Sequence, residues 1–223
     1  MSTVAAEFGG CGSPYERAME GCLVGSLRLQ PLADPAGAAS PVVLAVERFL
    51  APADATDRAV LARSRGPVLD VGCGPGRMVR AALLAGRPAL GVDVSPAAVR
   101  RAAAAGLPVL HRSVFDPLPR EGSWSTVLLL DGNIGIGGDP ARLLSRVAAL
   151  LAPDGVVLAE CHPRARRDRL FDAVLVDADG RAGEPFGWAE AGTATLTRLA
   201  GRVALRTVAR WRCAGRRFVA LAK

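Results

Sequence analysis

Three glycines at alternate positions follow a short apolar run, and their type and spacing suit the binding of a ligand. Gly72, Gly74 and Gly76 come directly after this run, in which Asp70 is the one acid. Glycine tolerates a positive φ angle and has no Cβ atom, so the backbone of such a turn can approach a ligand closely. Because a helix-like stretch follows at 77–86, the pattern is typical of the strand, loop and helix that open a nucleotide-binding α/β sheet.

The spacing of these glycines argues against a dinucleotide, because the G-x-G-x-x-G fingerprint needs glycine or alanine where this chain has Arg77. A second apolar run ends at Asp93, about 20 residues after the loop. A carboxylate only accepts hydrogen bonds, so in this place it can take both hydroxyl donors of a ribose. The pair of motifs indicates a ribose-containing ligand. The alternative is a glycine-rich turn and a helix-capping acid or serine, as in any α/β protein.

The two motifs, in this order, resemble the cofactor loop of class I S-adenosylmethionine (SAM)-dependent methyltransferases, particularly small enzymes of the actinobacterial type. The resemblance covers about residues 55–223. It implies an α/β fold, with a Rossmann-like, seven-stranded, mostly parallel sheet, an antiparallel C-terminal hairpin, helices on both faces and an N-terminal helical cap. It also implies SAM as cofactor, S-adenosylhomocysteine as its product, and methyl transfer by in-line displacement.

The resemblance further assigns residues to the parts of SAM. Those expected at the cofactor are Asp70, Gly72, Cys73 and Gly74 against the methionine half, Asp93 at the ribose, Val94 against the adenine, and Ser113 and Val114 at the adenine edge. Ser113 stands where the family commonly has an acid. Asp116 follows three residues later and is either a second candidate for the adenine or a turn residue before Pro117.

The acceptor side is expected at the ends of the fourth and fifth strands. A glycine-rich loop at 131–139 follows the apolar run 124–130, and in an α/β sheet this position puts Asp131 and Asn133 in the ligand crevice. Asp131 is predicted to face SAM or the acceptor, and Asn133 is a candidate catalytic residue. His162 ends the fifth strand and can accept a proton near neutral pH, so it is the candidate general base. The alternative for His162 is a structural role at the rim of the sheet.

Two aromatic residues are predicted to cover the site. Tyr15 lies in a helix that is expected to begin behind a Ser13 cap, and it can close over the cofactor as a lid. Trp188 can form a wall of the acceptor pocket. Ordinary packing is the alternative for both side chains.

The domain organisation follows from the segments that match the family and those that do not. Residues 55–223 are assigned to the methyltransferase domain. Residues 1–54 and a hairpin insert at 163–190 match no general pattern, so they are predicted to form a cap over the substrate.

The remaining elements are read from periodicity and turn signals. Apolar runs alternate with helical patterns, which predicts parallel strands joined by right-handed crossovers. The expected strands lie near 67–71, 88–92, 108–111, 124–130 and 156–161, with antiparallel strands at 202–211 and 216–222. Further expectations are an extended stretch at 26–30, helices at 42–50 and 56–63, and a turn at 153–155.

The charge of the chain is unevenly distributed. Residues 1–162 hold 15 basic and 15 acidic side chains, whereas residues 163–223 hold 13 basic and 6 acidic ones, which accounts for the net charge of +7. Lys223 is the only lysine, and this preference for arginine, with abundant alanine, indicates a coding bias more than a function. A run of arginines either binds a phosphate or an acidic substrate, or is a solvated loop: Arg164, Arg166, Arg167 and Arg169.

Composition narrows the compartment and the partners. No apolar run approaches the ~18 residues of a membrane span, so no membrane partner is expected. Five cysteines without a C-x-x-C pair argue against a metal site and favour a reduced, cytoplasmic protein.

The predicted function is SAM-dependent methyl transfer to a small molecule. One alternative is an RNA or protein methyltransferase, which the basic C-terminal quarter supports, although no nucleic-acid module accompanies it. The other alternative is a SAM-binding protein that transfers no methyl group. The acceptor atom and the oligomeric state are open at this point.

Overall fold

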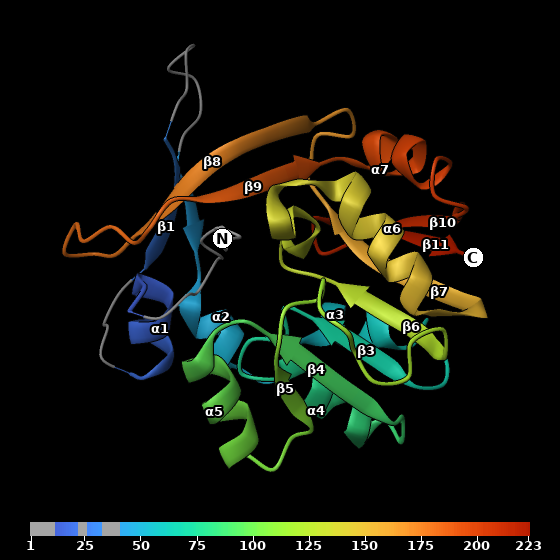
Figure 1. Cartoon of the computed structure of the whole chain (residues 1–223), viewed down its shortest axis with the longest axis horizontal. Coiled ribbons are helices and arrows are strands. Elements are labelled where there is room, and N and C mark those ends of the chain that lie inside the picture. The colour runs from blue at the N-terminus through green and yellow to red at the C-terminus, as the bar shows by residue number, and fades with distance from the viewer. Residues whose placement is uncertain (1–11, 22–25, 33–40) are drawn as a thin grey trace.

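The computed structural model describes residues 12–21, 26–32 and 41–223. Its main sheet has seven strands in the order β10–β11–β7–β6–β3–β4–β5 (Figure 1). β3 to β7 run parallel, whereas β11 pairs antiparallel with β7 and β10 antiparallel with β11. The strands are β3 (Val68–Val71), β4 (Ala89–Asp93), β5 (Val109–His111), β6 (Trp124–Leu129), β7 (Leu151–Cys161), β10 (Arg206–Cys213) and β11 (Arg216–Ala222). These directions confirm the predicted α/β sheet and its antiparallel C-terminal hairpin.

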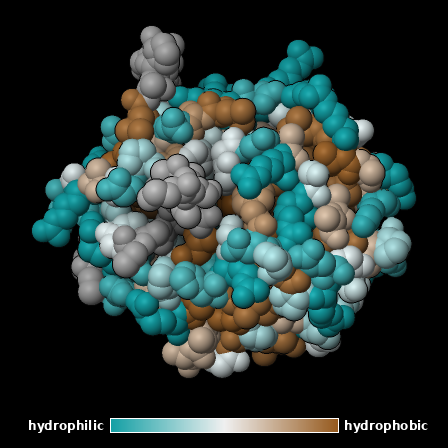
Figure 2. All heavy atoms as spheres, in the orientation of Figure 1, coloured by the Kyte–Doolittle hydropathy of each residue, from teal (hydrophilic) through white to brown (hydrophobic). Residues whose placement is uncertain are grey.

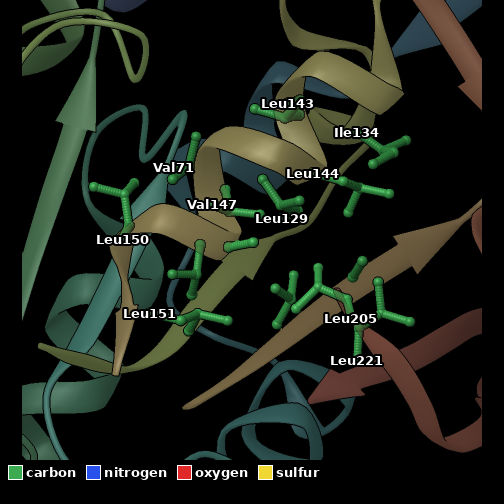
Figure 3. Packing of buried hydrophobic residues seen from close by; sticks show 14 of the residues in the cluster. Val71, Leu129, Ile134, Leu143, Leu144, Val147, Leu150, Leu151, Leu205 and Leu221 are labelled. Carbon is green, nitrogen blue, oxygen red and sulfur yellow. The ribbon is translucent and has the colours of Figure 1, made fainter. Parts of the chain in front are cut away.

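Helices cover both faces of this sheet because strand residues alternate between two apolar clusters. In β3, Leu69 belongs to the cluster that includes α6 and α7, whereas Val68 belongs to the cluster that includes α3 and α4. Figure 3 shows the first cluster, in which Leu143 and Val147 of α6 lie near Leu129 of β6. Full burial of one such side chain stabilises a fold by about 1.5–3 kcal/mol. The helices are α3 (Ala55–Leu61), α4 (Arg77–Leu84), α5 (Pro96–Ala104), α6 (Pro140–Leu150), α7 (Thr193–Ala200) and the 3₁₀ helix η1 (Asn133–Gly138).

A second, four-stranded antiparallel sheet lies over the carboxyl-end region of the first, in the order β2–β1–β8–β9 (Figure 1). It joins N-terminal strands to the predicted insert, because β1 pairs with β8. Its strands and the N-terminal helices are β1 (Leu27–Pro31), β2 (Val42–Leu44), β8 (Asp168–Val176), β9 (Phe186–Ala191), α1 (Pro14–Met19) and α2 (Val46–Leu50). The N-terminal region is therefore a mixed layer of strands and helices, not the helical cap that was predicted.

Three local predictions were wrong. The helix expected at 42–50 is instead the strand β2 followed by the short helix α2, because residues 42–44 pair with β1. The turn expected at 153–155 lies inside β7, as a bulge between the residue pairs Trp124–Leu151 and Thr126–Val156. The strand expected from residue 202 begins at 206, because the preceding residues turn and Leu205 N–H donates to Ala200 O.

The surface mixes polar and apolar residues, as Figure 2 shows for one face. The large apolar side chains that are exposed among the described residues come from many separate elements and loops: Leu32, Val42, Val43, Leu50, Leu83, Leu84, Leu170 and Val208. Among the described helices, none has both the length and the apolar character that crossing a bilayer requires.

Candidate active site

A cavity of about 1440 Å³ lies between the carboxyl ends of the parallel strands and the second sheet. The main sheet contributes the loops after β3, β4, β5, β6 and β7, and the second sheet contributes residues of β1, β2, β8 and β9. The arginines of the run 164–169 do not line this cavity, whereas the residues predicted at the cofactor and the acceptor do: Tyr15, Asp70, Gly72, Cys73, Gly74, Asp93, Val94, Ser113, Val114, Asp131, Asn133, His162 and Trp188. The fold therefore brings together groups that lie as far apart in the chain as α1 and β9.

The glycine loop after β3 has the backbone that its sequence predicts. Gly72 and Gly74 have φ angles of +69° and +53°, which side chains on L-residues rarely allow. A Cβ atom on Gly72 would lie 2.6 Å from Asn133 Nδ2, and one on Gly74 would lie 2.9 Å from the Tyr15 hydroxyl. The Asn133 amide holds the loop by donating to Val71 O at 2.8 Å and to Gly72 O at 2.9 Å. In this structure Asn133 is thus a brace for the loop.

Cys73 lies within the loop and points into the protein. Its thiol is buried and lies 3.6 Å from the carbonyl oxygen of Gly74. Burial raises the pKa of the thiol well above its ordinary value, so the group stays protonated near neutral pH. Cys73 is a packing residue beside the cavity, without the chemistry of a thiolate.

Asp93 is the last residue of β4, and its side chain links the end of β4 to the loop after β3. Its Oδ2 accepts a hydrogen bond from Gly74 N–H at 2.7 Å, and its Oδ1 accepts one from Ser95 N–H at 2.8 Å. Burial raises the pKa of Asp93, while these N–H donors oppose the rise. Each carboxylate oxygen has a second lone pair, so both can still accept a hydroxyl from a ligand in the cavity.

Asp70 lies at the end of β3 and is almost fully buried. Burial raises its pKa well above the ordinary value, and the nearby carboxylates of Asp131 and Asp93 raise it further. A cationic group bound beside Asp70 would relieve this repulsion. The position therefore suits a ligand that carries an ammonium group.

The loop after β5 forms the far end of the cavity. Ser113 Oγ accepts from Phe115 N–H at 3.4 Å, and Val114 is buried. Arg146 fixes the loop from α6 by donating to Val114 O at 2.8 Å and to Asp116 O at 2.6 Å. His111 lies beside this loop, where its Nε2 is 3.0 Å from Val94 O. These contacts hold the backbone of the predicted adenine side in place.

Asp131 lines the cavity, and three arginines bind its carboxylate. Arg77 Nη2 is hydrogen-bonded to Oδ2, while Arg48 Nε and Arg216 Nη2 lie 3.3 and 3.2 Å from Oδ1. The residue adopts a φ angle of +54°, and its N–H donates to Glu160 Oε2 at 2.8 Å.

The same three arginines also converge on the buried Asp57. Arg77 Nη1 is hydrogen-bonded to it, and Arg216 and Arg48 approach at 2.9 and 3.0 Å. Arg216 in addition binds both oxygens of Glu160, at 2.7 and 2.6 Å. We call this set the arginine cluster: Arg48, Arg77, Arg216, Asp57, Asp131 and Glu160.

Sequence reasoning missed the arginine cluster. Its signals were charged residues in unexpected places, namely Glu160 inside the apolar run of β7 and Arg77 at a fingerprint position. Its members come from α2, α3, α4, β7, β11 and the loop after β6, so their meeting depends on the fold.

The two aromatic residues lie where the second sheet and α1 cover the cavity. Tyr15 is buried with its hydroxyl over Gly74, and burial, followed by the charge of Asp93, raises its pKa well above the ordinary value. Trp188 is buried against Gly135 and makes an edge contact with Phe186, with ring centroids 5.9 Å apart. Both residues are packed in the core and also line the cavity; their roles as a lid over the cofactor and as a wall for the acceptor stay predictions.

His162 lies at the rim, directly after β7. Its N–H donates to Ala191 O at 2.9 Å, and its ring Nδ1 accepts from Arg164 N–H at 3.0 Å. Burial lowers the pKa of the ring, whereas the charge of Glu190 raises it and that of Arg167 lowers it.

Comparison with known proteins identifies the family of the chain and solved structures with a similar fold. The sequence profile of the methyltransferase domain family matches residues 44–189. No curated protein matches the sequence.

Several solved structures share the fold at low sequence identity. A SAM-dependent methyltransferase from Bacteroides fragilis, in complex with S-adenosylhomocysteine, superposes with a TM-score of 0.78 at 20% identity, covering 99% of this chain and 98% of that one. The 1,6-didemethyltoxoflavin N1-methyltransferase of Burkholderia thailandensis gives 0.56 at 20% identity, over 76% and 78% of the two chains. A sugar N-methyltransferase from a Streptoalloteichus species gives 0.55 at 20% identity, over 78% and 87%.

Proposed function

The chain belongs to the family of methyltransferase domains, and from this premise we propose that it transfers the methyl group of SAM to a small-molecule acceptor. The observation that carries the proposal is the bond from Gly74 N–H to Asp93 Oδ2, which joins the two predicted cofactor motifs at one cavity. The Bacteroides fragilis methyltransferase, which matches this chain over 98% of its own length, is in complex with S-adenosylhomocysteine. When bound, SAM supplies a methyl group already activated by a sulfonium.

The residues on the β3 and β4 side fit each part of SAM. Asp70 suits the ammonium group of the methionine half, because its own burial among carboxylates favours a cation nearby. Asp93 has lone pairs for the two ribose hydroxyls. Val94, Ser113 and Val114 form the wall that we assign to the adenine. Gly72, Cys73 and Gly74 supply the close backbone, and we assign to Asp131 and Asn133 the role of holding that backbone in place.

The enclosure of the other half of the cavity favours a small acceptor. Its walls include Leu29, Leu44, Phe49 and Trp188, so the second sheet and α2 cover it with apolar surface. A small molecule fits beneath such a cover more readily than a folded RNA or protein. The toxoflavin-precursor and sugar N-methyltransferases among the structural neighbours act on small molecules, in agreement with this choice.

We assign the cover to a cap formed by residues 1–54 and the insert 163–190, over a methyltransferase domain at 55–223. The pairing of β1 with β8 and the ion pair from Arg17 to Asp177, at 2.6 Å, support treating the two cap segments as one unit. Free thiols at Cys73, Cys161 and Cys213 suit the reducing cytoplasm that we propose as its compartment.

Calorimetry with SAM, S-adenosylhomocysteine and NAD tests the cofactor. We expect binding of the first two ligands and none of NAD. The variant Asp93→Ala should lose about 2–4 kcal/mol in S-adenosylhomocysteine binding, because charge-assisted hydrogen bonds to two hydroxyls are lost. The variant Asp93→Asn keeps one oxygen acceptor, so its affinity for S-adenosylhomocysteine should lie between those of the wild type and Asp93→Ala. Unchanged affinity in a folded Asp93→Ala protein rules out the ribose assignment, and binding of NAD alone rules out the proposal.

A screen for S-adenosylhomocysteine release tests the reaction. Release that depends on an added small molecule supports methyl transfer. Binding of SAM with no release across a broad panel of small molecules, RNA and proteins favours the alternative of a SAM-binding protein. Release with RNA, together with a steep loss of binding as salt is added, favours a nucleic-acid acceptor.

A further inference from the structure

The ring of His162 has a defined hydrogen-bonding state. Its Nδ1 accepts a hydrogen bond from the backbone N–H of Arg164 at 3.0 Å, so the lone pair of Nδ1 is occupied. A neutral imidazole carries one proton, which in this arrangement resides on Nε2. His162 lines the cavity, and Nε2–H is the hydrogen-bond donor that its neutral ring has for a ligand there.

The surroundings of His162 favour the neutral ring. Burial lowers its pKa, and the charge of Arg167 in the adjoining loop adds to this, while the charge of Glu190 on β9 opposes it. Glu190 is itself bound by Arg167 at 2.6 Å, which reduces its effect on the ring. In this neutral ring the lone pair of Nδ1 already accepts a hydrogen bond, and Nε2 already carries a proton. Nε2 therefore cannot take a proton from a substrate.

Five other titratable groups that line the cavity are also committed. The carboxylates of Asp131, Glu160 and Glu190 are each bound by at least one arginine. Burial raises the pKa of Tyr15 well above the ordinary value and that of Cys161 to about 12, so both keep their protons. Asp172, on β8, also lines the cavity but is exposed to solvent.

Resting on the proposed function, we propose that the methyl acceptor is an uncharged nitrogen that needs no base from the described residues. His162 positions the acceptor molecule by donating a hydrogen bond from Nε2 to an oxygen or nitrogen lone pair. A hydroxyl must give up its proton to become a good nucleophile, whereas a neutral nitrogen already has an available lone pair. That lone pair forms the new carbon–nitrogen bond as the carbon–sulfur bond breaks. S-Adenosylhomocysteine leaves, and the proton on the product ammonium passes to water.

Nitrogen-15 NMR tests the state of the ring without any acceptor. The chain has two histidines, so labelling with ¹⁵N-histidine gives two imidazoles, and the variant His111→Gln assigns them. In the S-adenosylhomocysteine complex we expect His162 to be the neutral Nε2–H tautomer at pH 7.5, with a pKa below 6.5. An Nδ1–H tautomer, or a ring that is protonated at pH 7, overturns the proposal while leaving the proposed methyl transfer intact.

A pair of variants tests the role with whichever acceptor the release screen identifies. His162→Gln keeps an N–H donor but cannot take up a proton. His162→Leu has no donor and cannot take up a proton either. We expect His162→Gln to keep kcat/KM within about threefold and His162→Leu to lose about tenfold, mostly through KM, as for one hydrogen bond. A fall in kcat of about 10²–10⁴-fold in both variants identifies a base and overturns the proposal.

Mass spectrometry of the methylated product tests the acceptor atom. We expect the methyl group on nitrogen, and a methyl group on oxygen or carbon equally overturns the proposal.

Discussion

Individual carboxylates in this protein differ in what surrounds them, and this decides what each can do. Asp93 combines burial with two backbone N–H donors, so its charge is supported while lone pairs remain for a ligand. Asp70 is buried beside Asp131 and Asp93 and has a pKa raised well above the ordinary value. Asp131 is bound by three arginines. Three acids on one cavity thus suit three roles, which are hydroxyl acceptor, partner for a cation, and anchor for a loop.

Asp70→Asn should stabilise the protein near neutral pH while weakening SAM binding. Because the folded-state pKa of Asp70 is raised, its ionisation costs stability; this cost is complete above the raised pKa, decreases as the pH falls below it, and disappears near the ordinary value of 3.8. We expect a rise in Tm of about 2–4 °C at pH 7, the shift that ~1 kcal/mol gives for a protein of this size. The difference from wild type should shrink as the pH approaches 4. Scanning calorimetry from pH 4 to 8 measures it, and a lower Tm for the variant at pH 7 contradicts this reading of Asp70.

The arginine cluster joins elements that the backbone alone leaves separate. It connects α2 of the cap with α3, α4, β7 and β11 of the main domain. Arg77 is the first residue of α4, so its bonds to Asp57 and Asp131 act directly behind the glycine loop. A cluster of this kind orients the helix that follows the loop. Because Asp57 and Arg77 are buried, removal of one partner leaves a buried charge uncompensated.

Asp57→Asn should cost about 3–5 kcal/mol in the free energy of unfolding, because three arginines lose the charge of a buried carboxylate. The amide can still accept the capping bond from Asp54 N–H, so the loss reports the charge. Asp54→Ser is the matched control. It keeps a helix-capping oxygen and removes only the partly exposed pair with Arg48, for which we expect less than about 1 kcal/mol. Urea denaturation compares the two variants, and equal losses would show that the cluster has no special place in stability.

The whole molecule is a two-sheet assembly with the cavity between the sheets. The main sheet supplies the loops at its carboxyl edge, and the second sheet, with α1 and α2, supplies the cover (Figure 1). The cover is held to the main domain by the arginine cluster through Arg48 and by packing of α1 against α5. The cap that we propose therefore predicts that this cover opens to admit ligands.

Hydrogen exchange should show that the cover is the less stable part. Lids are drawn from the low-stability regions of a fold, so the amides of α1, β1 and β2 should exchange faster than those of β3 and β6 in the free protein. Saturating S-adenosylhomocysteine should slow exchange in α1 by about tenfold or more, because a ligand that binds the closed form stabilises it. The hairpin β10–β11 serves as an internal control and should change little. Equal protection of α1 with and without ligand would mean that the cover is fixed scaffold.

The sequence by itself determined the parallel sheet, the glycine loop and the acid at the end of β4. These features depend on local chemistry: apolar periodicity places the strands, positive φ angles require Gly72 and Gly74, and the second strand must end near the first loop. Only the tertiary structure decided the second sheet, the arginine cluster and the state of the His162 ring. β1 pairs with β8 from the far half of the chain, and Arg48, Arg77 and Arg216 meet on Asp57 from separate elements. Contacts of that kind leave no period or spacing in the chain, because their partners are chosen by how distant elements pack.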